Sequence, residues 1–178
     1  MSKLKEWLSE LVEEELEDYD KLSVDDRVIS VIVILFFPLI ACYLLAHQLF
    51  STGFFTASFG PLEMVLLYGT PIYWIFTCTV LLLEYIDLSR DVDSFGGLAF
   101  AAIAFGWLSV VFPFDFVYFA DVLPEPLQFL LQWMSNDIAR VLLVIGFIVH
   151  LFLAILAGVM RVKVRKALAN TPKDKEIE

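Results

Sequence analysis

Cysteine is scarce in this sequence, and the two cysteines that occur stand alone. Cys42 and Cys78 each lie within an apolar stretch, and no Cys-x-x-Cys pair is present. A disulfide scaffold needs several paired cysteines, and a thiol–disulfide exchanger needs two neighbouring thiols. The sequence therefore gives no indication of either class, and we interpret both cysteines as small apolar side chains.

Catalytic motifs and basic surface are lacking as well. There is no His-Glu-x-x-His, no Gly-x-Ser-x-Gly, no phosphate-binding glycine loop and no Ser–Lys pair placed for intramembrane proteolysis. The 12 Lys and Arg are outnumbered by 22 Asp and Glu, which gives a net charge of −10. Nucleic-acid binding requires a basic surface, so we expect no nucleic-acid partner, no catalytic residue and, on balance, no enzyme.

Apolar residues, by contrast, make up 60% of the 178 residues. About twenty consecutive apolar residues are enough to cross a hydrocarbon core of roughly 30 Å. The first such stretch starts too late, and after too acidic a segment, for a cleaved secretory signal. We predict an all-α integral membrane protein with a four-helix transmembrane bundle. Its spans are expected at about 28–50, 62–86, 95–120 and 138–160.

The basic residues predict how these spans are oriented. With four spans, eleven of the twelve Lys and Arg fall on one face, and only Arg140 falls on the other. Cytoplasmic flanks retain positive charge during insertion. We therefore expect a multi-pass protein of the cell membrane with its amino and carboxyl termini in the cytoplasm.

Three segments follow from this arrangement. We predict an acidic amphipathic helix on the cytoplasmic side at residues 1–22 and the transmembrane domain at residues 23–160. Residues 161–178 are expected to form a cytoplasmic tail that is first basic and then polar. The first helix either rests at the membrane interface or places its acidic residues against a basic surface, which is the RVKVRK tail or another subunit. The pattern SVDD at 23–26 predicts the helix cap at which the first span begins.

The two external connections resemble each other. Both 60–71 and 125–136 contain Pro-Leu, a short apolar stretch and then a residue suited to cap a helix. We expect a short interfacial helix in each. The alternative for 60–86 is one long helix kinked at Gly69 and Pro71, which a membrane helix tolerates.

Charged residues near the outer ends of the spans form the first candidate site. Asp115 and Arg140 should lie at similar depth on antiparallel helices, so they could form a structural ion pair. Glu63 and Asp137 approach from the same side and could compete for Arg140. Two alternatives stay open, namely that all four reach headgroup water beside an aromatic belt, or that they form a ligand or ion pathway.

Intramembrane polar residues are the second candidate. His47 and His150 differ in depth by roughly 10 Å on helical geometry, which argues against a haem held by both, and no short spacing links a metal-ligand set. We expect neither cofactor nor metal. His150 is interpreted as an interhelical hydrogen-bonding group, with a proton relay as the alternative, and Glu84 as an interfacial carboxylate.

Small residues predict where the helices pack. Gly146, Ala154 and Gly158 recur with His150 along one side of the fourth span, and the third span offers a facing set. That set comprises Gly97, Ala101, Ala102 and Gly106. The function expected from these features is that of an accessory or structural subunit, which packs against another membrane protein or a second copy of itself. The alternative is a homo-oligomeric channel or transporter that uses the acidic and histidine residues.

Overall fold

The computed structural model describes residues 3–17, 22–57, 59–92 and 96–170 of the chain. Outside the described residues lie 1–2 and 18–21 of the expected amino-terminal helix, residue 95 at the start of the third expected span, and 171–178 of the expected tail. Every regular element within the described residues is helical. In chain order these are α1 Lys3–Glu17, α2 Val24–Leu49, α3 Pro61–Leu82, α4 Ile86–Val92, α5 Leu98–Val111, the 3-10 helices η2 Phe116–Tyr118 and η3 Glu125–Leu130, and α6 Asn136–Asn170.

Three of these helices are long and apolar enough to cross a membrane: α2, α3 and α6. Their 26, 22 and 35 residues extend over about 39, 33 and 52 Å at 1.5 Å per residue. The start of α2 is confirmed as the sequence predicts, because the Ser23 hydroxyl accepts a hydrogen bond from the Asp26 backbone N–H in a capping box. The lengths and composition are those of a membrane protein.

The first external connection differs from the prediction of a separate interfacial helix. Residues from Pro61 onward already belong to α3, which continues without a break through Gly69 and Pro71. The alternative of one long helix is therefore the correct description of this region. Pro61 occupies the first turn, where its missing N–H leaves no hydrogen bond unmade. In the second connection, η3 is the short helix that the sequence predicts.

The third expected span, at 95–120, is shorter than predicted. Helix α5 has 14 residues, or about 21 Å, and is the one expected span that does not reach the length needed to cross the core. It ends where Phe112 adopts a left-handed conformation, with φ of 40°. Phe112 precedes Pro113, and the proline ring disfavours the helical conformation in the residue before it. The predicted four-span bundle is thus shown only in part.

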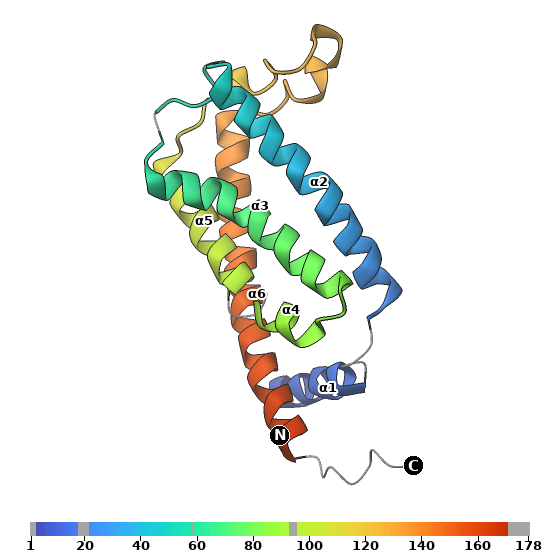
Figure 1. Cartoon of the computed structure of the whole chain (residues 1–178). Helices are drawn as coiled ribbons and strands as arrows, with labels where there is room; N and C mark the ends of the chain where they lie inside the picture. Colours follow the sequence, from blue (N-terminus) through green and yellow to red (C-terminus); the bar gives the residue numbers. More distant parts are fainter. Residues whose placement is uncertain (1–2, 18–21, 58, 93–95, 171–178) are drawn as a thin grey trace.

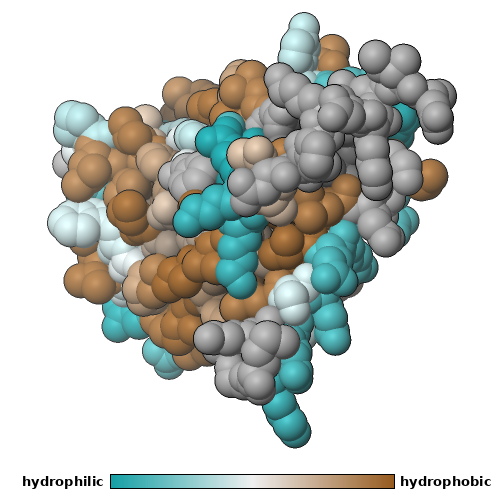
Figure 2. Space-filling view, turned by 90° about the horizontal axis from the view of Figure 1, so that it is seen from below, coloured by the Kyte–Doolittle hydropathy of each residue, from teal (hydrophilic) through white to brown (hydrophobic). Residues whose placement is uncertain are grey.

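The contacts between the helices form an open row from α2 through α3 and α5 to α6, and in Figure 1 α6 passes behind α3. Helix α2 packs on α3, α3 on α5 and α5 on α6, while α2 and α6 do not pack along each other in the part of the chain that the structure describes. In its most apolar window α6 has no buried residue, and α2 has 6% buried. Seen from the α1 end, apolar side chains still cover much of the surface (Figure 2). Outside a membrane this surface would be highly unfavourable.

Helix α1 lies at one end of the molecule and contacts α6 near its carboxyl end (Figure 1). Helix α1 therefore lies beside the basic segment of its own chain, and both alternatives for residues 1–22 stay predictions. Val164, in that part of α6, is only 1% exposed. Helix α6 runs to Asn170, so the first half of the expected cytoplasmic tail is helical.

Candidate functional site

Asp115 and Arg140 lie at the same end of the molecule but are not joined in an ion pair. Asp115 follows the end of α5 and caps η2, where its carboxylate accepts hydrogen bonds from the Val117 backbone N–H at 3.2 Å and from Asn136 Nδ2 at 3.4 Å. The Arg140 guanidinium instead lies 4.5 Å from the centre of the Phe112 ring, a cation–π contact. Because α5 ends at Val111, Asp115 is a loop residue and does not face Arg140 across two helices.

The other predicted acidic residues are dispersed. Glu63 lies in the first turn of α3 and accepts a hydrogen bond from the Trp107 indole N–H at 3.4 Å. Asp137 lies exposed in the first turn of α6, and a carboxylate in either first turn is favoured by the helix dipole. Glu84, at the far end of α3, pairs with Arg27 at 3.7 Å between two exposed side chains. The structure does not bring these carboxylates together.

The loop after α2 and the loop after α5 meet in a cluster that we call the aromatic cap. The Asp115 backbone N–H donates to Phe54 O at 2.7 Å, and the Thr56 N–H donates to Pro113 O at 3.1 Å. These bonds satisfy backbone groups outside any helix, where a buried amide without a partner would be costly. Phe54, 1% exposed, lies at the centre with its ring 4.8 to 5.4 Å from its phenylalanine neighbours. The aromatic cap consists of His47, Phe54, Phe55, Phe114, Phe116 and Phe119.

His47 is the polar centre of the aromatic cap and is 1% exposed. Its Nε2 lies 3.1 Å from Phe119 O, and its Nδ1 is hydrogen-bonded to the Thr52 hydroxyl. A carbonyl oxygen only accepts, so Nε2 carries the proton and Nδ1 accepts from Thr52. The Tyr43 hydroxyl donates to the same Phe119 oxygen. With both nitrogens engaged, His47 is a structural group that joins α2 to two loops. Its partners could not be predicted from the sequence.

Beneath the aromatic cap lies a cavity of about 360 Å³ bounded by α2, α3, α5 and α6. Phe54, Phe114, Phe116 and Phe119 form its outer boundary, and Trp74 and Phe105 lie at its opposite boundary. Thr70 contributes a polar side chain to the lining, and its hydroxyl is already bonded to Leu66 O at 3.1 Å. The Thr70 hydroxyl is therefore not an unpaired donor, and the cavity offers mainly apolar contacts. None of the predicted polar site residues lines it.

His150 lies next to this cavity without lining it. Its ring stacks on Trp74 with a centroid distance of 5.3 Å and contacts the tilted ring of Phe105 with a centroid distance of 4.9 Å. Its Nδ1 lies 2.8 Å from Gly146 O, one turn earlier in the same helix, so Nδ1 carries the proton. The contact that His150 makes with the neighbouring helices is thus aromatic stacking, where the sequence predicted an interhelical hydrogen bond.

Two glycines of the predicted packing stripe form a reciprocal contact between α5 and α6. A Cβ at Gly106 would lie 3.0 Å from the Phe147 ring, and a Cβ at Gly146 would lie 3.3 Å from the Phe105 ring. Each glycine accepts the phenylalanine of the other helix, as close helix packing in membranes requires. Ala101 is fully buried and Gly97 is buried. Ala154 is half-buried, while Gly158 has open space around its Cα.

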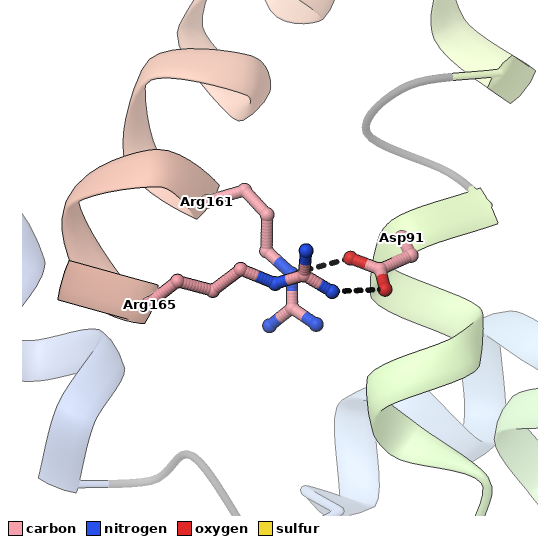
Figure 3. Close-up of polar contacts among 3 residues, drawn as sticks. All are labelled: Asp91, Arg161 and Arg165. Carbon is pink, nitrogen blue, oxygen red and sulfur yellow. Dashed lines mark hydrogen bonds and ion pairs between the residues drawn. The ribbon is translucent and has the colours of Figure 1, made fainter. Parts of the chain in front are cut away.

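At the end opposite the aromatic cap, the structure reveals a charged cluster that the sequence did not predict (Figure 3). Asp91 in α4 accepts from Arg161 Nε at 2.7 Å, and its other carboxylate oxygen pairs with Arg165. The two arginines are one turn apart on α6 and converge on the single carboxylate (Figure 3). The Arg161 side chain is only 4% exposed. The i, i+4 spacing of the arginines was visible in the sequence, but the position of Asp91 depends on α4.

The potential metal-ligating side chains are dispersed in the described part of the chain. Within residues 3–17, 22–57, 59–92 and 96–170, no three His, Cys, Asp or Glu side chains are grouped so as to hold a metal ion. No protein-family model matches this chain, and neither a curated protein nor a solved structure matches it. The features that bear on function are the exposed helix faces, the apolar cavity and the two ends described above.

Proposed function

We propose that this chain is an accessory or structural subunit of the cell membrane that packs against another membrane protein, or a second copy of itself, through its exposed apolar helices. The supporting observation is the open row of helices. Within the described residues, α2 packs mainly on α3 and α6 mainly on α5, and α2 and α6 do not pack along each other. The membrane-facing sides of α2 and α6 are consequently available for other helices, which in lipid associate through close packing.

This geometry favours a subunit over a channel or transporter. A pathway would require polar groups that converge on a common internal space. Glu63 and Asp115 bond to nearby loop and interfacial groups, Glu84 pairs at the opposite end, and His150 is stacked between aromatic rings. The cavity beneath the aromatic cap is lined mainly by apolar side chains, and none of these four residues lines it.

Three matched pairs of residues allow this proposal to be tested helix by helix. Each pair is an isoleucine followed four residues later by a phenylalanine, and each side chain is 51 to 62% exposed. The pairs are Ile32 and Phe36 on α2, Ile72 and Phe76 on α3, and Ile148 and Phe152 on α6. Changing each pair to alanine removes the same side-chain volume, and no charge, from a different helix. The α3 pair is the control, because the proposal places the partner on α2 and α6.

The measurement is native mass spectrometry of the tagged full chain, solubilised gently from its host. We expect a stoichiometric second chain, or a defined homo-oligomer, that is lost from the α6 or α2 variant and retained by the α3 variant. Recovery of the bare monomer from the unchanged protein, or equal recovery of the complex from all three variants, would contradict the proposal.

The proposal includes cytoplasmic termini, supported by the position of the basic residues. In a background with Cys42→Ala and Cys78→Ala, single cysteines are introduced at Glu125 in the outer connection and at Lys166 near the end of α6, both of which are exposed. A membrane-impermeant maleimide added to intact cells should modify only position 125. Modification of position 166 before permeabilisation would reverse the orientation.

A further inference from the structure

The apolar cavity is closed at two ends and flanked at its side by helices that do not pack along each other. The aromatic cap forms its outer boundary, and the stack of Trp74, Phe105 and His150 lies at its inner boundary. Leu44 from α2 and Leu143 from α6 both line it, yet these two helices leave the space between them without helix–helix contact along their lengths. The side between α2 and α6 therefore faces the hydrocarbon of the bilayer.

Its chemistry excludes water and favours hydrocarbon. A water molecule needs two to four polar partners, and an apolar cavity without them stays dry. An empty cavity forfeits the dispersion contacts of its lining. Its 360 Å³ lies within the size range of small-molecule sites. The cavity lies among helices that are apolar enough to span a membrane. Within a bilayer, the abundant, flexible and apolar molecule is a lipid acyl chain.

We propose that this cavity holds the acyl chain of a bilayer phospholipid, which enters laterally between α2 and α6. The chain lies against Leu44, Trp74 and Leu143, beneath Phe54. The headgroup stays at the membrane surface, because the aromatic cap blocks the route between the outer loops and the cavity. This site is distinct from the outward faces that carry the proposed subunit contacts, since Ile148 and Phe152 do not line the cavity.

The test uses the full chain in nanodiscs of unlabelled phosphatidylcholine that contain a small fraction of phosphatidylcholine with a diazirine near the end of one acyl chain. After illumination, adducts are mapped by mass spectrometry of peptides. We expect adducts on cavity residues of at least two helices, Leu44 and Trp74 among them, in addition to adducts on lipid-facing residues. Adducts restricted to outward residues such as Ile72 and Phe152 would overturn the proposal.

Adjacent residues of α5 supply a matched pair of variants. Ala104 is 2% exposed and lines the cavity, whereas Ile103 is 62% exposed on the outer side. Ala104→Phe fills the cavity and should lower the cavity adducts about tenfold, equivalent to about 1.4 kcal/mol of binding, while Ile103→Phe leaves them unchanged. Ala139→Phe fills the cavity from α6 and serves if Ala104→Phe does not fold. Undiminished cavity adducts in either folded filling variant would overturn the proposal.

A second probe separates the possible sources of the chain. The same diazirine on a free fatty acid should label the cavity no better than the phospholipid does. Cavity labelling by the free acid alone would overturn the assignment to phospholipid. Recovery of the partner complex, measured on the same filling variants, is expected to be unchanged, so this proposal and the proposed function can fail separately.

Discussion

The two ends of the molecule are held together by different chemistry. At the end with the aromatic cap, two loops are joined by packed rings and neutral hydrogen bonds around Phe54 and His47, both 1% exposed. At the opposite end, α4 is joined to α6 by one carboxylate and two arginines. Backbone groups of the two loops are satisfied by each other within an apolar cluster, whereas the arginines of α6 are satisfied by a carboxylate. The comparison indicates that apolar burial should dominate stability at the end with the aromatic cap, and charge at the other end.

The largest effect is expected at the centre of the aromatic cap. Phe54→Ala removes a ring that contacts four phenylalanines and should lower the free energy of unfolding by about 3–5 kcal/mol. Phe50, 77% exposed four residues earlier, is the control. Thermal unfolding in one detergent would measure both variants. Equal losses for Phe54→Ala and Phe50→Ala would show that the aromatic cap is not packed as described.

A smaller effect is expected at the charged cluster. Asp91→Asn removes the negative charge to which Arg161 and Arg165 bond, and should cost about 1.5–3 kcal/mol, the range for hydrogen bonds to charged groups. Glu84→Gln is the matched control, because its ion pair with Arg27 is exposed on both sides and contributes no more than about 1 kcal/mol. If the two variants unfold alike, burial of Arg161 does not strengthen the cluster.

Much of this architecture could be predicted from the sequence, because hydropathy is a local property. The starts of α2 and α6 lie within a few residues of the predicted positions. The capping box at Ser23 could be predicted from the four residues 23–26. The early end of α5 had a local signal in Pro113, which the apolar run around it obscured. The single helix over the first external connection was one of two local alternatives.

The two ends could not be predicted in the same way. The aromatic cap depends on the pairing of residues 54–56 with residues 113–115, which are far apart in the chain. The charged cluster depends on α4, a helix of seven residues with no marked periodicity. Asp115 and Arg140 were assigned similar depth because α5 was expected to continue, and its early end gave each residue a different neighbour.

Removing the hydrogen bond from Thr52 to His47 tests whether the polar contacts of the aromatic cap stabilise the fold as neutral hydrogen bonds. Thr52→Val removes this donor and should cost about 1 kcal/mol, as a neutral hydrogen bond does. Thr56→Val changes an exposed threonine of the same loop and should be neutral. Unfolding is compared at low and high salt. The loss of unfolding free energy caused by Thr52→Val should be the same at both salt concentrations. A loss that disappears at high salt would contradict a hydrogen bond between neutral groups.

Arg165→Gln should show the smallest effect and the opposite salt response. Its side chain is 55% exposed, so its attraction to Asp91 is screened by water and contributes about 0.2–1 kcal/mol at low salt. Raising the salt to 1 M shortens the screening length to about 3 Å, and the difference from the unchanged protein should then disappear. Because the Arg161 side chain is 4% exposed, Arg161→Gln should retain most of its cost at 1 M salt. If Arg165→Gln costs as much at 1 M as at low salt, the arginine acts through packing, and the contrast between an apolar end and a charged end would fail.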